Sequence, residues 1–136
     1  MATLAVLAIL LAVTAPLFSQ IRQVYDLRGA AREIFSELQK ARMAAVMENN
    51  RYRFVLIDSS QYKIHDDNDN DNVEDAGETV TTKNVQTDSP GVTFTATNTV
   101  TFVPNGTASS YGTITLTNTS GSKSVVVSSA GRIRIQ

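Results

Sequence analysis

Hydrophobic and polar residues follow three successive patterns along the chain. Residues 1–21, MATLAVLAILLAVTAPLFSQI, contain no charged side chain. The segment that follows, up to Asn50, repeats apolar residues at alternating spacings of three and four, which is typical of an amphipathic helix. From Arg51 onward the period becomes two, which is typical of strands. The pattern therefore predicts a long amino-terminal helix over residues 1–50 and a β domain over residues 51–136.

The uncharged run is long enough to cross a bilayer, because 18 helical residues span about 27 Å. A cleavable signal peptide is an alternative, since Val13, Thr14 and Ala15 are small residues near a plausible cleavage point. A buried core helix is another. We favour a membrane segment, because no Lys or Arg precedes the run and Pro16 would directly follow the cut. Core helices also tend to have shorter apolar runs.

Beyond Arg22 the helix is expected to bury one face and to end near Asn49 and Asn50. The predicted buried stripe consists of Leu27, Ala31, Ile34, Leu38, Ala41 and Ala45. The charged residues expected on the other faces are Arg28, Arg32, Glu33, Glu37 and Lys40. Pro16 should kink or locally melt the helix, because it removes a backbone donor and clashes with the preceding turn. Tyr25 and Phe35 are interpreted as helix-packing residues.

Short strands separated by turn residues fill the rest of the chain. RYRFVLID and QYKIH flank a turn at Ser59 and Ser60, and TVTTKNV, VTFTAT, TVTFV, YGTITLT, KSVVVS and GRIRIQ follow. Apolar residues alternate with Thr, Ser or Arg in these segments, which indicates sheet with one buried and one solvated face. The predicted fold class is α+β: one long amino-terminal helix, membrane-spanning in its first half and amphipathic in its second, packed on an antiparallel β-sheet domain.

Composition excludes several kinds of chemistry. The chain has no Cys, so it can form neither a disulfide nor a thiolate metal site. Its single His is His65, and no nucleophile elbow, Gly-rich phosphate loop or zinc motif is present. We therefore expect no enzyme activity and no small-molecule substrate.

Acidic residues are concentrated in one loop. Residues 66–78, DDNDNDNVEDAGE, hold seven of the chain's 13 carboxylates. Counted from Asp67, the side chains at positions 1, 3, 5, 9 and 12 and the backbone carbonyl at position 7 match a twelve-residue calcium loop. These ligands are Asp67, Asp69, Asp71, Asp75 and Glu78, with the Val73 carbonyl. Position 6, normally Gly, is Asn72, which tolerates a left-handed backbone. We favour a Ca²⁺ site over a solvated acidic turn, and we interpret His65 as a strand-end residue rather than a ligand.

The amino-terminal segment resembles the helix of type IV pilins and type II secretion pseudopilins. The shared features are an apolar helix that passes a proline, here Pro16, with an aromatic residue soon after, here Phe18. The end of the chain, SVVVSSAGRIRIQ, is similar to the GspH/FimT branch of minor pilins and pseudopilins. One departure from the family is that residues 1–21 contain neither its cleavage site nor its acidic residue, which helps to register neighbouring subunits.

The resemblance implies a structural role. It predicts a minor pseudopilin or pilin that is anchored in the bacterial inner membrane by a single pass, with its β domain in the periplasm. The subunit would then join a periplasmic or extracellular filament of a type II secretion system or type IV pilus. Its partners would be other pilin or pseudopilin subunits, bound through the amino-terminal helix.

The carboxyl end offers an alternative function. On a strand, Arg132 and Arg134 would lie on one face, roughly 6.7 Å apart, with Ile133 and Ile135 buried opposite. The resemblance to FimT-like minor pilins, which end in Gly-Arg-x-Arg, implies DNA binding during uptake through Gly131, Arg132 and Arg134. We favour a simpler interpretation, in which the two arginines guard an edge strand against joining another sheet.

Overall fold

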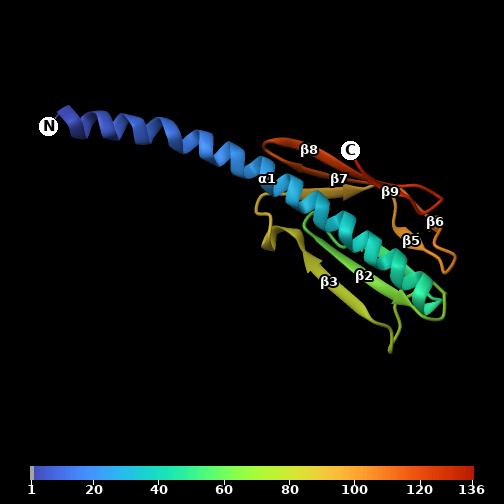
Figure 1. The fold of residues 1–136 in the computed structure, drawn as a ribbon. Coiled ribbons are helices and arrows are strands. Elements are labelled where there is room, and N and C mark those ends of the chain that lie inside the picture. The colour runs from blue at the N-terminus through green and yellow to red at the C-terminus, as the bar shows by residue number, and fades with distance from the viewer. Residues whose placement is uncertain (1) are drawn as a thin grey trace.

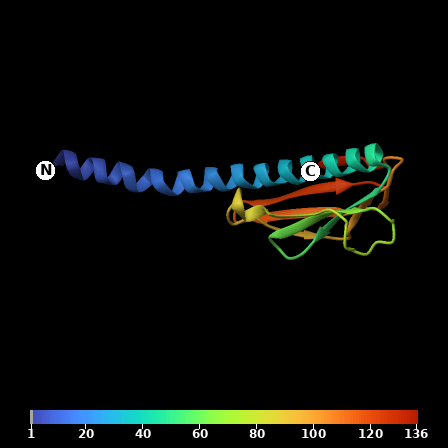
Figure 2. The same ribbon diagram turned by 90° about the horizontal axis from the view of Figure 1, so that it is seen from below.

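A single long helix packed on antiparallel strands forms the protein, which confirms the α+β fold class (Figure 1). The computed structural model describes residues 2–136, without the side chains of residues 13–15. Helix α1 (Ala2–Glu48) has 47 residues, and its first half extends beyond the β domain. The strands lie on one side of its second half (Figure 2).

Helix α1 continues through Pro16, so the predicted local melting is wrong. Figures 1 and 2 show that the helix stays continuous but changes direction between its apolar first part and the part that packs on the domain. Pro16 removes only one backbone donor, and its flanking alanines and leucines favour the helix. The Ser19 hydroxyl donates to the Pro16 carbonyl oxygen at 2.9 Å, one turn later. The apolar and amphipathic halves therefore form one continuous rod.

The predicted apolar stripe is the buried face of α1. All six residues are at most 5% exposed, and Ala30 joins them at 0%. Phe35 packs against this core as expected, whereas Tyr25 is 68% exposed and is not part of it. The expectation for Glu37 is also wrong, because it is 6% exposed. Its carboxylate is held by Lys40 at 2.8 Å and by Lys83, from a distant strand, at 2.9 Å.

The first sheet has five antiparallel strands. They are β1 (Arg51–Leu56), β2 (Gln61–Asp67), β3 (Val80–Asn84), β5 (Val100–Phe102) and β6 (Ala108–Ser110), in the order β3-β2-β1-β5-β6. The predicted hairpin around Ser59 and Ser60 is confirmed by the β1–β2 pairing. A 3-10 turn (Val85–Thr87) follows β3.

The second sheet has four antiparallel strands. They are β4 (Thr93–Ala96), β7 (Thr113–Asn118), β8 (Gly121–Val127) and β9 (Ile133–Ile135), in the order β4-β7-β8-β9. Alternate residues of this sheet face the helix and are buried, including Phe94, Leu116 and Val125. Ile133 is buried as predicted, but Ile135 is 40% exposed, because β9 is the last strand and ends there.

An aromatic cluster joins the two sheets beneath α1. The rings of Phe54 and Tyr62 stack at 4.8 Å, and Tyr62 meets Phe94 of the second sheet edge-on at 5.9 Å. The Tyr62 hydroxyl donates to Glu33 of the helix at 3.1 Å. Burial, followed by the charges of Glu33 and Glu37, raises the pKa of Tyr62, so this phenol stays a donor. Helix and both sheets thus share one core.

Candidate functional site

The first half of α1 is an exposed apolar surface. An 18-residue window in it has a mean hydropathy of 2.2, and none of that window is buried within the protein. The large apolar side chains that lie open are Leu4, Val6, Leu7, Ile9, Leu10, Leu11, Leu17, Phe18 and Ile21. A contiguous surface of this kind marks a membrane or protein contact. The β7–β8 turn meets the helix where it leaves the domain, since the Asn118 side-chain amide donates to the Gln23 carbonyl oxygen at 2.7 Å.

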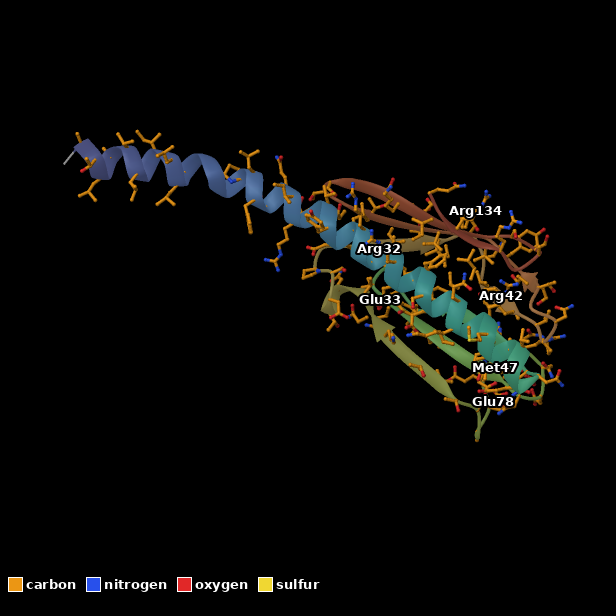
Figure 3. All side chains as sticks on the ribbon, viewed as in Figure 1. Arg32, Glu33, Arg42, Met47, Glu78 and Arg134 are labelled. Atoms are coloured by element: carbon orange, nitrogen blue, oxygen red, sulfur yellow. The ribbon has the colours of Figure 1, made fainter. Side chains whose placement is uncertain are left out.

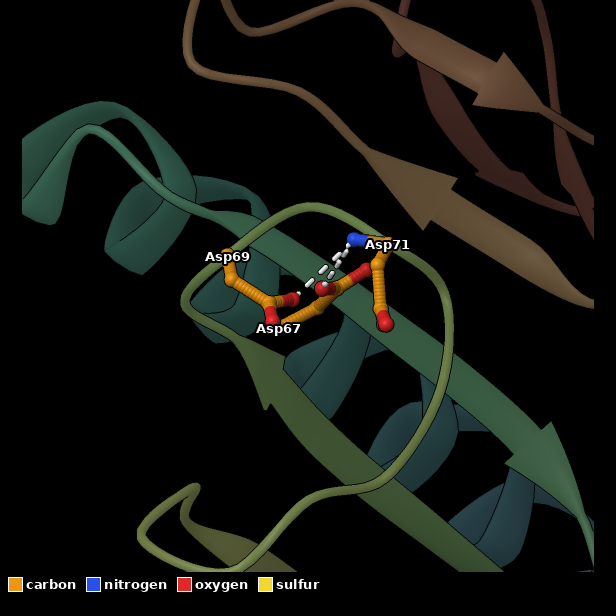
Figure 4. A group of neighbouring side chains, drawn as sticks. All are labelled: Asp67, Asp69 and Asp71. Carbon is orange, nitrogen blue, oxygen red and sulfur yellow. Dashed lines mark hydrogen bonds between the residues drawn. The ribbon is translucent and has the colours of Figure 1, made fainter.

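Three of the predicted calcium ligands come together in the acidic loop. Oxygen atoms of Asp67, Asp69 and Asp71 lie within 4.8 Å of one another (Figure 4). Asp67 is fully buried at the end of β2, whereas Asp69 and Asp71 are exposed. The Asp71 N–H donates to Asp67 at 3.1 Å and to Asp69 at 3.2 Å. These bonds turn the carboxylates toward one point.

The loop backbone adopts the conformation expected at position 6. Asn72 has φ = 68°, and Asn70 has φ = 64°. Both values lie in the left-handed region, which Asn tolerates better than most residues. The backbone of Asn72 is therefore left-handed, the conformation for which calcium loops normally use Gly at position 6.

Neighbouring carboxylates contribute to the pKa of Asp69. The N–H of Asp71 lowers the pKa of Asp69, but desolvation and the charges of Asp71, Glu78 and Asp75 together leave this pKa above its ordinary value. A divalent cation among these oxygens would relieve that repulsion. Oxygen is also the donor that Ca²⁺ prefers.

Glu78, predicted as the ligand at position 12, makes hydrogen bonds within the loop and to β2. Among the described residues, the group formed by Asp67, Asp69 and Asp71 includes neither Asp75 nor Glu78. The Glu78 carboxylate instead accepts the N–H groups of Asn68 at 2.9 Å and Asp75 at 3.0 Å, and it lies 2.6 Å from His65 Nε2. The N–H of Asp75, followed by His65, lowers the pKa of Glu78. Glu78 thus closes the loop onto β2, and His65, buried on that strand, is its partner.

The loop is also surrounded by basic side chains that the sequence patterns did not single out. Arg51 donates to the Asn70 carbonyl oxygen at 3.1 Å, Arg53 donates to that of Asn72, and Lys63 pairs with Glu74. The β1–β2 register places Arg51 opposite Asp67 and Arg53 opposite His65. The hairpin turn at Ser59 and Ser60 could have revealed this register, because it sets which residues face each other.

The two carboxyl-terminal arginines are exposed on β9 and just before it. Neither has an ion pair or a hydrogen-bonded side chain among the described residues. Arg134 points away from the helix (Figure 3), on the opposite strand face from Ile133. Gly131 has a structural role: its φ is +75°, and a Cβ there would lie 2.1 Å from the Gly106 carbonyl oxygen.

Comparison with known proteins places this architecture in a family. The family model described as type II transport protein GspH matches residues 30–131, about three quarters of the chain. The chain belongs to the GspH family. This family lies within the type IV pilin and pseudopilin superfamily, which confirms the resemblance noted in the sequence. Its members are structural subunits, and membership implies assembly with other pilin-type subunits in a filament.

Solved structures share the fold. The type IV minor pilin FimU of Pseudomonas aeruginosa PAO1 matches in one crystal form with 24% identity and a TM-score of 0.61, over 81% of this chain and 92% of that one. A second crystal form of FimU gives 21% identity and a TM-score of 0.61, over 85% and 92%. The minor pseudopilin EpsH of the Vibrio cholerae type 2 secretion system gives 10% identity and a TM-score of 0.62, over 82% and 96%. No curated protein matches the sequence.

Proposed function

We propose that this GspH-family chain is a minor subunit of a type II secretion or type IV pilus filament. Before assembly it is held in the bacterial inner membrane by the first half of α1, with the β domain in the periplasm. The observation that carries the proposal concerns helix α1. Its first half is apolar and exposed, whereas the buried face of its second half is part of the domain core. Such a surface requires lipid or the same segment of neighbouring subunits around it.

The test compares the full chain with a truncated chain beginning at Asp26. The full chain should require detergent or lipid to stay in solution, whereas the truncated chain should be soluble and folded, because the buried face of α1 begins at Leu27. Introduced cysteines at Val6 in two copies should form a disulfide in the membrane if the apolar segments associate. A full chain that is monomeric in buffer without detergent would contradict the proposal.

We further propose that the acidic loop binds Ca²⁺. The clustered oxygens of Asp67, Asp69 and Asp71 and the left-handed Asn72 support this assignment. The ion would offset the mutual repulsion of the carboxylates and would stabilise the folded loop by RT ln(1 + [L]/Kd). Glu78 could enter the coordination shell only by exchanging some of its present hydrogen bonds. The Asp67→Asn variant of the protein should therefore lose more affinity for Ca²⁺ than the Glu78→Gln variant.

Thermal unfolding of the full chain in detergent tests the calcium site. The melting temperature should rise in millimolar Ca²⁺ and return on adding EDTA, and Mg²⁺ should do less because it demands a tighter octahedral shell. The Asp67→Asn variant should lose the shift. The control is Asp58→Asn, which removes a carboxylate from a different turn. Identical melting curves in Ca²⁺ and in EDTA would mean that the loop is a solvated acidic turn that binds no Ca²⁺.

DNA capture through Arg132 and Arg134 is the second candidate function. One observation favours it: residues 89–136, which include all four strands of the second sheet, contain three basic residues and no Asp or Glu. Replacing both arginines with Ala should weaken binding about equally for all DNA sequences, since phosphate contacts carry no base information. The salt dependence should also become shallower by roughly one unit per lost contact. If the parent protein fails to bind DNA at low salt, the two arginines serve only to keep the edge strand from joining another sheet.

A further inference from the structure

A basic cleft lies where α1 meets the second sheet. Arg28, Arg32 and Lys123 line it together with Ala31 and Ile135, around a volume of about 350 Å³. The two arginines lie one helical turn apart and share a face of α1. Among the residues that the structure describes, none of the three cations forms an ion pair or a side-chain hydrogen bond. Three unpaired cations around a cleft form a site for an anionic group.

The length of the apolar segment sets the level of this cleft relative to a membrane. The stretch from Ala2 to Ile21 carries no charge. About 20 helical residues are about 30 Å long, which equals the hydrocarbon thickness of a bilayer. The hydrocarbon therefore ends near Ile21 when the segment spans the membrane. The β7–β8 turn lies just outside this level, because its Asn118 side chain donates to the Gln23 carbonyl oxygen at 2.7 Å.

The cations of the cleft lie within reach of the lipid headgroups. The backbones of Arg28 and Arg32 are about 10 and 16 Å beyond Ile21 along the helix. Helical side chains lean by about one turn, or about 5 Å, toward the amino end of the helix, which here lies in the membrane. The two guanidinium groups are therefore about 5 and 11 Å outside the hydrocarbon. Because a headgroup layer is about 5–8 Å thick, Arg28 enters this layer, and Arg32 and Lys123 flank its outer side.

The charge around the cleft suits an anionic surface. Residues 22–32 of α1 include three arginines and one acid, Asp26, which is paired with Arg22 at 4.0 Å. Residues 118–121 of the neighbouring turn are neutral. The exposed Asp88 follows β3, which lies on the opposite flank of α1 from β8 (Figure 1). Within the part of the chain that the structure describes, no acidic side chain lines the cleft, so an external anion has no internal competitor there.

We propose that the basic cleft binds the phosphate group of an anionic phospholipid, such as phosphatidylglycerol, at the periplasmic surface of the inner membrane. The guanidinium groups of Arg28 and Arg32 donate to the phosphate oxygens, and Lys123 adds a third positive charge from the sheet. Because the cations come from both α1 and β8, one bound headgroup fixes the orientation of the domain against the membrane. The inference rests on the proposed function, since it requires the first half of α1 to span the bilayer.

The contact forms only while the subunit is anchored. An outward movement of about 10 Å carries the cleft beyond the headgroup layer, so the phosphate must be released before the subunit joins a filament. Each cation near an anionic lipid surface strengthens binding roughly fivefold, so the two arginines together contribute a factor of about 30. The cleft therefore distinguishes an anchored subunit from one that has left the membrane.

Quenching of a fluorophore beside the cleft tests the contact, since the chain has no native Cys that would also be labelled. The label is attached to the full-length Ser122→Cys variant, at an exposed position next to Lys123. The protein is reconstituted into phosphatidylcholine vesicles that contain a small, fixed fraction of lipid with a spin-labelled headgroup. Replacing part of the phosphatidylcholine with phosphatidylglycerol should increase the quenching, and added salt should reverse the increase. The matched label at Ser109→Cys, on the exposed surface of β6 and far from the apolar segment (Figure 1), should not respond.

Two double variants test whether the cleft is responsible. Arg28→Gln with Arg32→Gln should lower the affinity for phosphatidylglycerol about 30-fold, so quenching should stay near its level in pure phosphatidylcholine. Gln preserves the helix propensity of both positions, so the fold should be retained. The control is Arg132→Gln with Arg134→Gln, which removes the same charge from two arginines that are also unpaired but lie outside the cleft. This control should respond to phosphatidylglycerol as the parent does.

Three outcomes would overturn the inference. The first is a parent protein whose quenching is unchanged by phosphatidylglycerol. The second is an equal response from the variant that lacks Arg28 and Arg32. The third is inorganic phosphate at millimolar concentration that raises the melting temperature of the parent in detergent, but not that of this variant, while phosphatidylglycerol leaves the quenching unchanged. That result would identify a soluble phosphate as the ligand.

Flotation with the vesicles separates this failure from failure of the proposed function. The full chain should float with vesicles of either lipid composition, because its apolar segment inserts into both. If it floats while the quenching ignores phosphatidylglycerol, the membrane anchor holds and only the lipid contact is wrong. If it does not float with either kind of vesicle, the proposed membrane anchor itself is wrong.

Discussion

Replacing Gly131 with Ala should destabilise the domain strongly, because two separate effects add. The residue has φ = +75°, where an L side chain costs about 1–2 kcal/mol. The new Cβ would also lie 2.1 Å from the Gly106 carbonyl oxygen and 3.1 Å from Arg42 Nε. Those two atoms hydrogen-bond to each other at 2.8 Å, and losing a bond to a charged group costs roughly 1.5–3 kcal/mol. The expected loss of unfolding free energy is therefore about 3–5 kcal/mol.

Gly91 provides the matched control. Its φ is +82°, but a Cβ there would meet nothing within 4 Å. The Gly91→Ala variant should therefore lose only the backbone part, about 1–2 kcal/mol. Near-ultraviolet circular dichroism of the full chain in detergent would follow unfolding through the buried Tyr62. The Gly131→Ala variant should melt roughly 5–15 °C below the Gly91→Ala variant. Equal melting temperatures would refute the close approach of residues 106 and 131, and with it the structural explanation of the glycine that precedes Arg132.

Three further changes test other parts of the structure. Burial raises the pKa of Glu37, but hydrogen bonds from Lys40 and Lys83 outweigh it and hold this pKa below its ordinary 4.5. The ionised Glu37 carboxylate therefore adds to the free energy of unfolding above pH 4.5, and this stabilisation is lost as the pH falls below that value. In urea unfolding, the free energy of unfolding should fall less between pH 6 and pH 3 for Glu37→Gln than for the parent. Equal decreases would contradict this. In the same assay at pH 7, Asn72→Ala should lower the free energy of unfolding by about 1 kcal/mol, and Asn72→Gly should lower it much less, because φ is 68° at this position. Similar decreases for the two variants would exclude the left-handed backbone. Ile34→Ala, at a fully buried position, should cost about 2–5 kcal/mol, and a loss below 1 kcal/mol would mean that the helix face is not packed as described.

The helix and most strands were predictable from the sequence, because their signals are local. A repeat of three and four identified the buried stripe from Leu27 to Ala45, and alternation identified the strands on either side of each turn. The twelve-residue spacing likewise identified Asp67, Asp69 and Asp71, which the fold brings together. Each of these inferences needed only residues that lie close in the chain.

The features that the sequence did not reveal depend on distant partners. Glu37 is buried because Lys83, 46 positions away in the chain, reaches it. The division into two sheets arises from β1 pairing with β5 across an intervening stretch of more than 40 residues, a long-range choice that alternation does not encode. Tyr25 is exposed near the edge of the domain, where the β7–β8 turn meets the helix at Gln23. Ion pairs, sheet order and domain edges all require the tertiary structure.

The uninterrupted passage of α1 through Pro16 has a mechanical consequence. One rod, about 70 Å long at 1.5 Å per residue, is both the apolar segment and the central element of the domain core. A pull on the apolar segment is therefore transmitted directly to the helix–sheet contacts, where it acts as shear along the buried stripe. No flexible linker absorbs the load within the part of the chain that the structure describes. The resistance of the subunit to traction is thus set by the packing of Ala30, Ile34 and Leu38 against the sheets, and weakening that packing should make the domain yield before the rod does.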